Sequence, residues 1–80
     1  MDKSEVKTKL TRIFRDTFAN ENLEIQETTT ADQVEGWDSL AHITLIVAVE
    51  KGFGISLTLR EVRSMKNVGD LMNLIEKKVA

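Results

Sequence analysis

Apolar residues recur at helical spacing in three segments of this chain. The chain has no cysteine, so disulfide bonds cannot stabilise a small core of another kind. Spacings of three and four residues bring side chains onto one face of a helix. Eighty residues lie near the lower limit for a core that sustains itself, and proline is absent. We therefore expect an all-α fold, with residues 1–80 forming a single domain. The three sets are Val6, Leu10, Ile13, Phe14 and Phe18; Leu45, Ile46, Val49 and Phe53; and Val68, Leu71, Met72, Ile75 and Val79.

Capping residues and a glycine set the expected ends of the helices. The first helix is expected to have Ser4 as its N-cap and to end near residues 19–20. The second covers Ser39–Phe53, and Gly54 then supplies the left-handed conformation that often ends a helix. A short helix covers Leu59–Arg63, and the last begins after Asn67 as N-cap. The prediction is a small four-helix bundle, with three main helices and one short helix.

A long loop, Asn20–Asp38, separates the first and second helices. Four apolar residues can hold it against the bundle: Leu23, Ile25, Val34 and Trp37. Thr30–Gln33 has the spacing of a capping box, so one helical turn is expected there. The loop also carries six acids and no Lys or Arg, which disfavours nucleic acid and favours positively charged protein partners.

The second helix is apolar on most of its circumference. Besides its core stripe it has a second stripe, Leu40, Ile43 and Val47. A helix of this kind is usually buried all round, but so small a bundle has too few elements to surround it. We expect the second stripe to be exposed and to form a contact surface. The alternative is that the long loop folds over these three residues.

The hydroxyl of Ser39 stands where the polar loop meets this helix, in the run Gly36-Trp37-Asp38-Ser39-Leu40. Asp38 can serve as N-cap, which leaves the hydroxyl free. A serine nucleophile would need a base, and His42 is the only histidine, but no third group or oxyanion site is identifiable. A phosphodiester at a helix N-terminus gains from free backbone N–H groups and the helix dipole. Ser39 is therefore predicted to be an attachment point, with Asp38 able to help hold a divalent cation during phosphoryl transfer.

The same run, followed by an apolar helix that ends in Phe53-Gly54-Ile55, resembles the acyl carrier proteins over essentially the whole chain. The resemblance implies that Ser39 receives 4′-phosphopantetheine from coenzyme A through a Mg²⁺-dependent phosphopantetheinyl transferase. The thiol of this arm would hold acyl groups as thioesters. The resemblance also implies docking of partner enzymes through Leu40, Ile43 and Val47, with Glu50 as a retained acid.

The partners implied are the transferase and acyl-activating, condensing or acyl-transferring enzymes of fatty-acid, lipid or secondary-metabolite biosynthesis. Carriers of fatty-acid synthesis usually have several acids along the second helix. Here Ala41, Thr44 and Lys51 occupy positions that are often acidic, and Arg60 and Arg63 follow on the third helix. Docking to the basic patches of fatty-acid synthase enzymes is expected to be weaker, which favours a specialised pathway.

Two other functions remain open at the level of the sequence. One is an unmodified four-helix adaptor that binds a protein through the Leu40, Ile43 and Val47 stripe. The other is a very small serine hydrolase. The leading prediction is a cytoplasmic, monomeric carrier with no catalytic residue, no resident metal ion and no membrane span. In this prediction Trp37 anchors the loop and shapes the exit of the arm, and His42 faces solvent.

Overall fold

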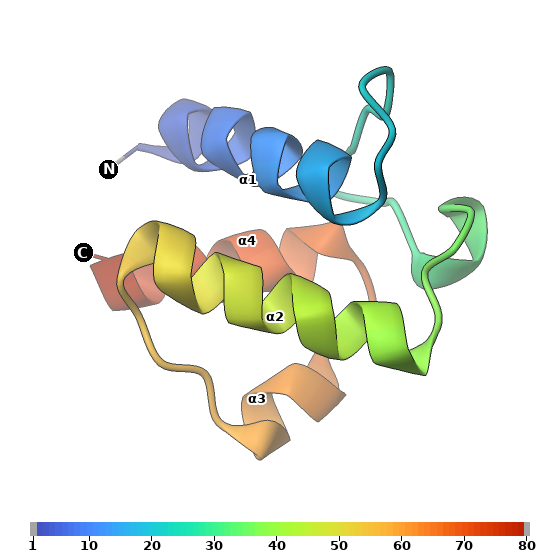
Figure 1. Ribbon diagram of the computed structural model, residues 1–80. Coiled ribbons are helices and arrows are strands. Elements are labelled where there is room, and N and C mark those ends of the chain that lie inside the picture. The colour runs from blue at the N-terminus through green and yellow to red at the C-terminus, as the bar shows by residue number, and fades with distance from the viewer. Residues whose placement is uncertain (1, 80) are drawn as a thin grey trace.

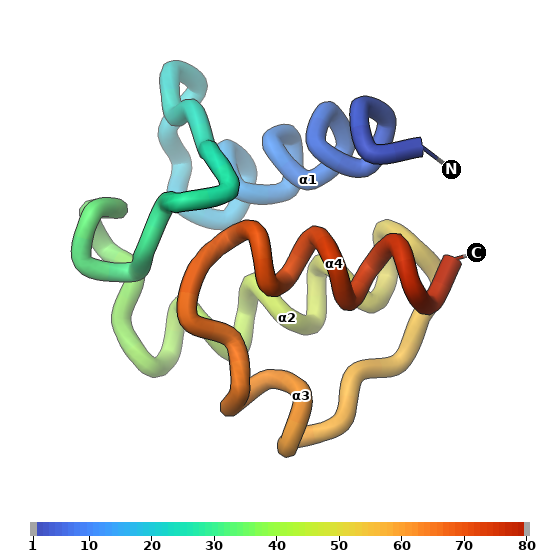
Figure 2. Tube along the Cα trace, turned by 180° about the vertical axis from the view of Figure 1, so that it is seen from behind, coloured from blue at the N-terminus to red at the C-terminus, as the bar shows by residue number. Residues whose placement is uncertain are grey.

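The computed structural model describes residues 2–79, and this range contains helices and no strand. α1 runs in the opposite direction to α2 and α4, while the short α3 lies beside α2 (Figures 1 and 2). The predicted bundle of three main helices and one short helix is confirmed. In chain order the helices are α1 (Lys3–Thr17), the 3₁₀ turn η1 (Ala31–Gln33), α2 (Ser39–Phe53), α3 (Leu59–Ser64) and α4 (Val68–Val79).

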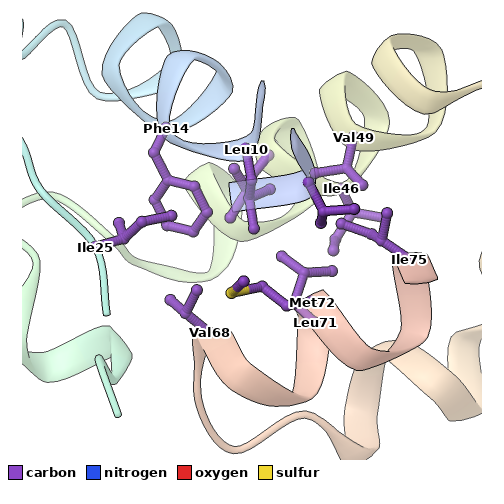
Figure 3. Packing of buried hydrophobic residues seen from close by; sticks show 11 residues of the cluster. Leu10, Phe14, Ile25, Ile46, Val49, Val68, Leu71, Met72 and Ile75 are labelled. Carbon is purple, nitrogen blue, oxygen red and sulfur yellow. The ribbon is translucent and has the colours of Figure 1, made fainter. Parts of the chain in front are cut away.

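The core lies between α1, α2 and α4, each of which turns one apolar face inward (Figure 3). Burial of each such side chain stabilises the fold by about 1.5–3 kcal/mol. Phe53 differs from expectation, because it is only half-buried and its ring lies 5.1 Å from the Lys9 ammonium group. The core members are Val6, Leu10, Phe14, Ile25, Leu45, Ile46, Val49, Val68, Leu71, Met72 and Ile75.

Side-chain caps define where the helices begin. Asp2, and not Ser4 as predicted, caps α1, because its carboxylate accepts the Glu5 N–H at 2.9 Å. Before α4, the side-chain oxygen of Asn67 accepts the Asp70 N–H at 2.9 Å, as predicted. Gly54 ends α2 with a φ of 66°, the left-handed conformation expected of it.

The connection between α1 and α2 is held against the bundle by buried side chains and by backbone hydrogen bonds. Ile25 and Val34 are buried, as the sequence predicted. The backbone N–H groups of Val68 and Gly69 donate to the carbonyl oxygens of Thr29 and Glu27, both at 2.8 Å. This connection is therefore fastened to the start of α4 by hydrogen bonds as well as by apolar contact.

Trp37 closes the connection with aromatic contacts on both sides. Its ring meets Phe14 edge-on at 5.3 Å and lies 5.9 Å from Phe18. Its indole N–H donates to Nδ1 of His42 at 3.0 Å, and the two rings are stacked. His42 is therefore half-buried, and the prediction that it faces solvent is wrong. Burial lowers the pKa of His42, and the bond from Trp37 also requires Nδ1 to be unprotonated.

We expect Gly69→Ala to lower the free energy of unfolding by about 1–3 kcal/mol. A Cβ at Gly69 would lie 2.8 Å from the backbone oxygen of Glu27 and would force the connection away from α4. The matched control is Gly52→Ala, whose Cβ would lie 2.8 Å from only the terminal methyl of Ile13. That methyl can rotate away, and alanine adds about 1 kcal/mol of helix propensity. Urea unfolding of both variants checks the prediction, and equal losses would contradict it.

The stability of the protein should fall as the pH drops through the ordinary pKa of histidine. Because the folded protein holds the pKa of His42 low, the unfolded chain takes up this proton first and is favoured at lower pH. Between about pH 7.5 and 5.5, the His42→Gln variant should lose less unfolding free energy than the wild type. Urea titrations across this range measure the difference. Parallel curves for the two proteins would show that His42 does not titrate as described.

Candidate functional site

Ser39 is the first residue of α2, and the residue before it does the capping. The Asp38 carboxylate accepts the Ala41 N–H at 2.8 Å, while the Asp38 carbonyl accepts the His42 N–H at 2.9 Å. Ser39 is exposed, and no side-chain hydrogen bond among residues 2–79 engages its hydroxyl. As predicted, Asp38 caps α2 and leaves the hydroxyl of Ser39 free of a capping role.

The start of α2 suits a phosphate group on this hydroxyl. The first turn of a helix leaves backbone N–H groups without partners, and the dipole of α2 adds partial positive charge there. Asp38 is the one acid next to Ser39 in the chain. Within residues 2–79, no cluster of three or more acidic or histidine side chains could bind a metal ion. A cation at Asp38 would therefore need ligands from another molecule.

A shallow hollow lies beside Ser39 and the stacked Trp37 and His42 rings. It is lined by Ala31, Trp37, Asp38, Ser39 and His42. A second hollow shares Ala31, Trp37 and His42 and continues to Met65, Lys66 and Asn67. A flexible group on Ser39 would thus have an aromatic wall beside it. Both roles predicted for Trp37, holding the connection and lining the exit from Ser39, are compatible with this position.

The stripe on α2 is exposed directly after Ser39. Leu40, Ile43 and Val47 expose 74%, 62% and 43% of their surface. The alternative in which the long loop covers these residues is therefore wrong. Leu59, at the start of α3, is 64% exposed and was not predicted as part of this surface.

Glu50 lies at the edge of this surface and makes a contact within the molecule. Its Oε2 accepts the backbone N–H of Leu57 at 2.9 Å, and the residue is half-buried. The carboxylate therefore holds the connection between α2 and α3 in place. This contact was not predicted, because it depends on the path of the chain after Gly54.

In the described part of the chain, the serine and the histidine that a serine hydrolase would need are not hydrogen-bonded to each other. No hydrogen bond between Ser39 and His42 occurs within residues 2–79, and Nδ1 of His42 is occupied by the Trp37 N–H. A hydroxyl without a base is a weak nucleophile. Ser39 can be acted upon by another enzyme, but it lacks the means to activate itself.

No helix in the described part of the chain has the length and apolar character needed to cross a membrane.

Comparison with known proteins gives the same picture over nearly the full length. The family model of the phosphopantetheine attachment site matches residues 8–75. An acyl carrier protein from Thermosynechococcus vestitus is 31% identical over 81 residues, covering 100% of this chain and 99% of its own. The solution structure of the holo acyl carrier protein from Geobacter metallireducens matches with a TM-score of 0.88 and 39% identity, over 92% of this chain and 85% of that one. The chain belongs to the acyl carrier proteins, a family of carriers, not enzymes, that bear 4′-phosphopantetheine.

Proposed function

We propose that Ser39 is the residue that carries the 4′-phosphopantetheine arm. The observation that supports this assignment is an exposed hydroxyl at the start of α2, released from capping by Asp38. In the transfer, the Ser39 oxygen attacks the phosphorus of coenzyme A that bears the pantetheine. A new O–P bond forms, the diphosphate bond breaks, and adenosine 3′,5′-bisphosphate leaves. The proton of the hydroxyl passes to a base on the phosphopantetheinyl transferase, because this chain provides none.

Asp38 has two roles in this proposal. One carboxylate oxygen stays on the Ala41 N–H and keeps the start of α2 in place. The other oxygen is free to share a Mg²⁺ ion with the transferase while the phosphoryl group moves. The arm then supplies the thiol that forms thioesters with acyl groups, a chemistry that a chain without cysteine lacks.

Partner enzymes dock, in this proposal, on the exposed stripe of Leu40, Ile43 and Val47. An exposed apolar patch of this kind next to the attachment point allows one surface to orient the arm for every partner. Glu50 supports the edge of the surface by holding the connection to α3. The partners are the transferase and enzymes that load, condense or transfer acyl groups. We place this single-domain carrier, residues 1–80, in the cytoplasm, where coenzyme A supplies the arm.

Incubation with coenzyme A, Mg²⁺ and a phosphopantetheinyl transferase should add one phosphopantetheinyl group to the wild-type protein. Ser39→Ala should add none, and Ser56→Ala, which removes another exposed hydroxyl, should be modified like the wild type. Intact-mass spectrometry measures all three proteins. Modification of Ser39→Ala would contradict the assignment. A wild type that is never modified would favour the unmodified adaptor.

Replacing Ile43 with serine should weaken docking without weakening the fold. Because Ile43 is exposed, the free energy of unfolding should change by no more than about 0.5 kcal/mol. The KM of the transferase for the apo-carrier should rise by about tenfold, which corresponds to about 1.4 kcal/mol of lost contact. Thr44→Ser is the control, since it changes the next residue of α2 without removing a large apolar group. Unchanged kinetics for Ile43→Ser would exclude this residue from the docking surface.

A further inference from the structure

Every exposed charged side chain between Ser39 and Lys66 is basic. The exposed ones are Lys51, Arg60, Arg63 and Lys66. The segment has only two acids, Glu50 and Glu61, and both are half-buried. The acidic character of the chain therefore lies elsewhere, with six acids in the connection before α2.

Both acids of this segment are engaged within the molecule. Glu50 accepts the Leu57 N–H at 2.9 Å. Glu61 accepts the Thr58 N–H at 2.9 Å, and the same oxygen lies 3.0 Å from the Lys78 ammonium group of α4. The bond from the Thr58 backbone, and then the one from Lys78, lower the pKa of Glu61. Glu61 is thus ionised, but its charge is matched by Lys78 and is not offered to a partner.

α3 turns its basic side chains away from the core, toward solvent. Val62 and Met65 pack against the core, and Glu61 points to α4 through Lys78. Leu59 and Arg63 are four residues apart and share the side of α3 that is away from α4. The chain before Leu59 is held to α2 through Glu50, and α3 lies below α2 in the view of Figure 1.

The far end of the stripe is basic as well. Lys51 follows Val47 by four residues, so it continues the same face of α2 toward its C-terminus. The exposed large apolar residues of α2 and α3 are thus Leu40, Ile43, Val47 and Leu59, and the exposed charged residues of these two helices are Lys51, Arg60 and Arg63. We call these four apolar and three basic residues the cationic docking face.

We propose that the cationic docking face selects partner enzymes whose own carrier-binding surface has carboxylates around an apolar depression. This inference rests on the proposed docking through Leu40, Ile43 and Val47 and adds the charge of the partner. Complementary charges at an interface speed encounter and exclude wrong partners, whereas like charges placed together oppose binding. A partner with a basic patch would meet Arg60 and Arg63 with repulsion.

Binding to one enzyme in two forms of opposite charge tests this proposal. The probe is a fatty-acid synthase enzyme with a basic carrier-docking patch, used as it is and with the patch residues changed to Glu. Kd is measured by calorimetry at low salt with the apo-carrier. The wild-type carrier should bind the acidic form about tenfold more tightly, since each exposed charge pair contributes a few-fold and reversal turns attraction into repulsion. Added salt should reduce this preference.

Two carrier variants locate the effect. Arg60→Glu with Arg63→Glu should reverse the preference, so that the basic form binds more tightly. Lys7→Glu with Lys9→Glu makes the same change in net charge on α1 and should keep the wild-type preference. Circular dichroism and urea unfolding establish that each variant is folded. If the pair on α3 proves unstable, Arg60→Gln with Arg63→Gln should still diminish the preference.

Three results would overturn the proposal: a wild-type carrier that prefers the basic form, a carrier with no preference, or an equal effect of the α1 variant. Tight binding to vesicles of phosphatidylserine, with none to either enzyme form, would also overturn it and assign the face to an anionic membrane. Because the apo-carrier is used, the outcome does not depend on the arm. Failure to modify Ser39 would remove the proposed attachment site and leave the charge preference standing.

Discussion

Other helices cover only one side of α2, and the rest of the structure depends on this constraint. α1 and α4 bury Leu45 and Val49 completely, but no further long helix is present in the described chain to cover the opposite side. The apolar stripe that starts at Leu40 therefore stays at the surface, next to Ser39. One helix thus stabilises the bundle with one face and exposes the other, which we propose as the docking surface. The buried face and the proposed docking surface come from the same 15 residues.

A small number of polar and aromatic contacts fix the position of the residues around Ser39. Asp38 sets the first turn of α2, and Trp37 holds the preceding residues against Phe14. His42 completes this arrangement from within α2 by accepting the indole N–H. The side chain of Ser39 is therefore exposed, while the backbone beneath it is held from both sides. In the proposed function, this arrangement presents the same serine to the transferase in a constant position.

The sequence predicted most of the fold and the residues proposed for the site, because both depend on local spacing. Helical periodicity, Gly54 and Asn67 gave the main helices and most of their ends. Asp2 was missed in favour of Ser4 because the two residues have nearly equal capping preference, and packing decides between them. The contacts of His42 with Trp37 and of Glu50 with Leu57 could not be predicted, since each depends on how a loop returns to α2. The basic residues of the proposed docking face, Lys51, Arg60 and Arg63, are evident in the sequence, whereas the engagement of Glu50 within the molecule is not.

The first and last helices bring both ends of the described chain to the same pole of the bundle, and α2 begins at the opposite pole (Figure 1). A fused domain, an affinity tag or a surface linkage attached at either end would project away from Ser39. The carrier can therefore be joined in series with an enzyme, or fixed to a solid support, with its working end still turned outward. The end of the bundle that can be linked to other molecules is therefore separate from the end that carries Ser39.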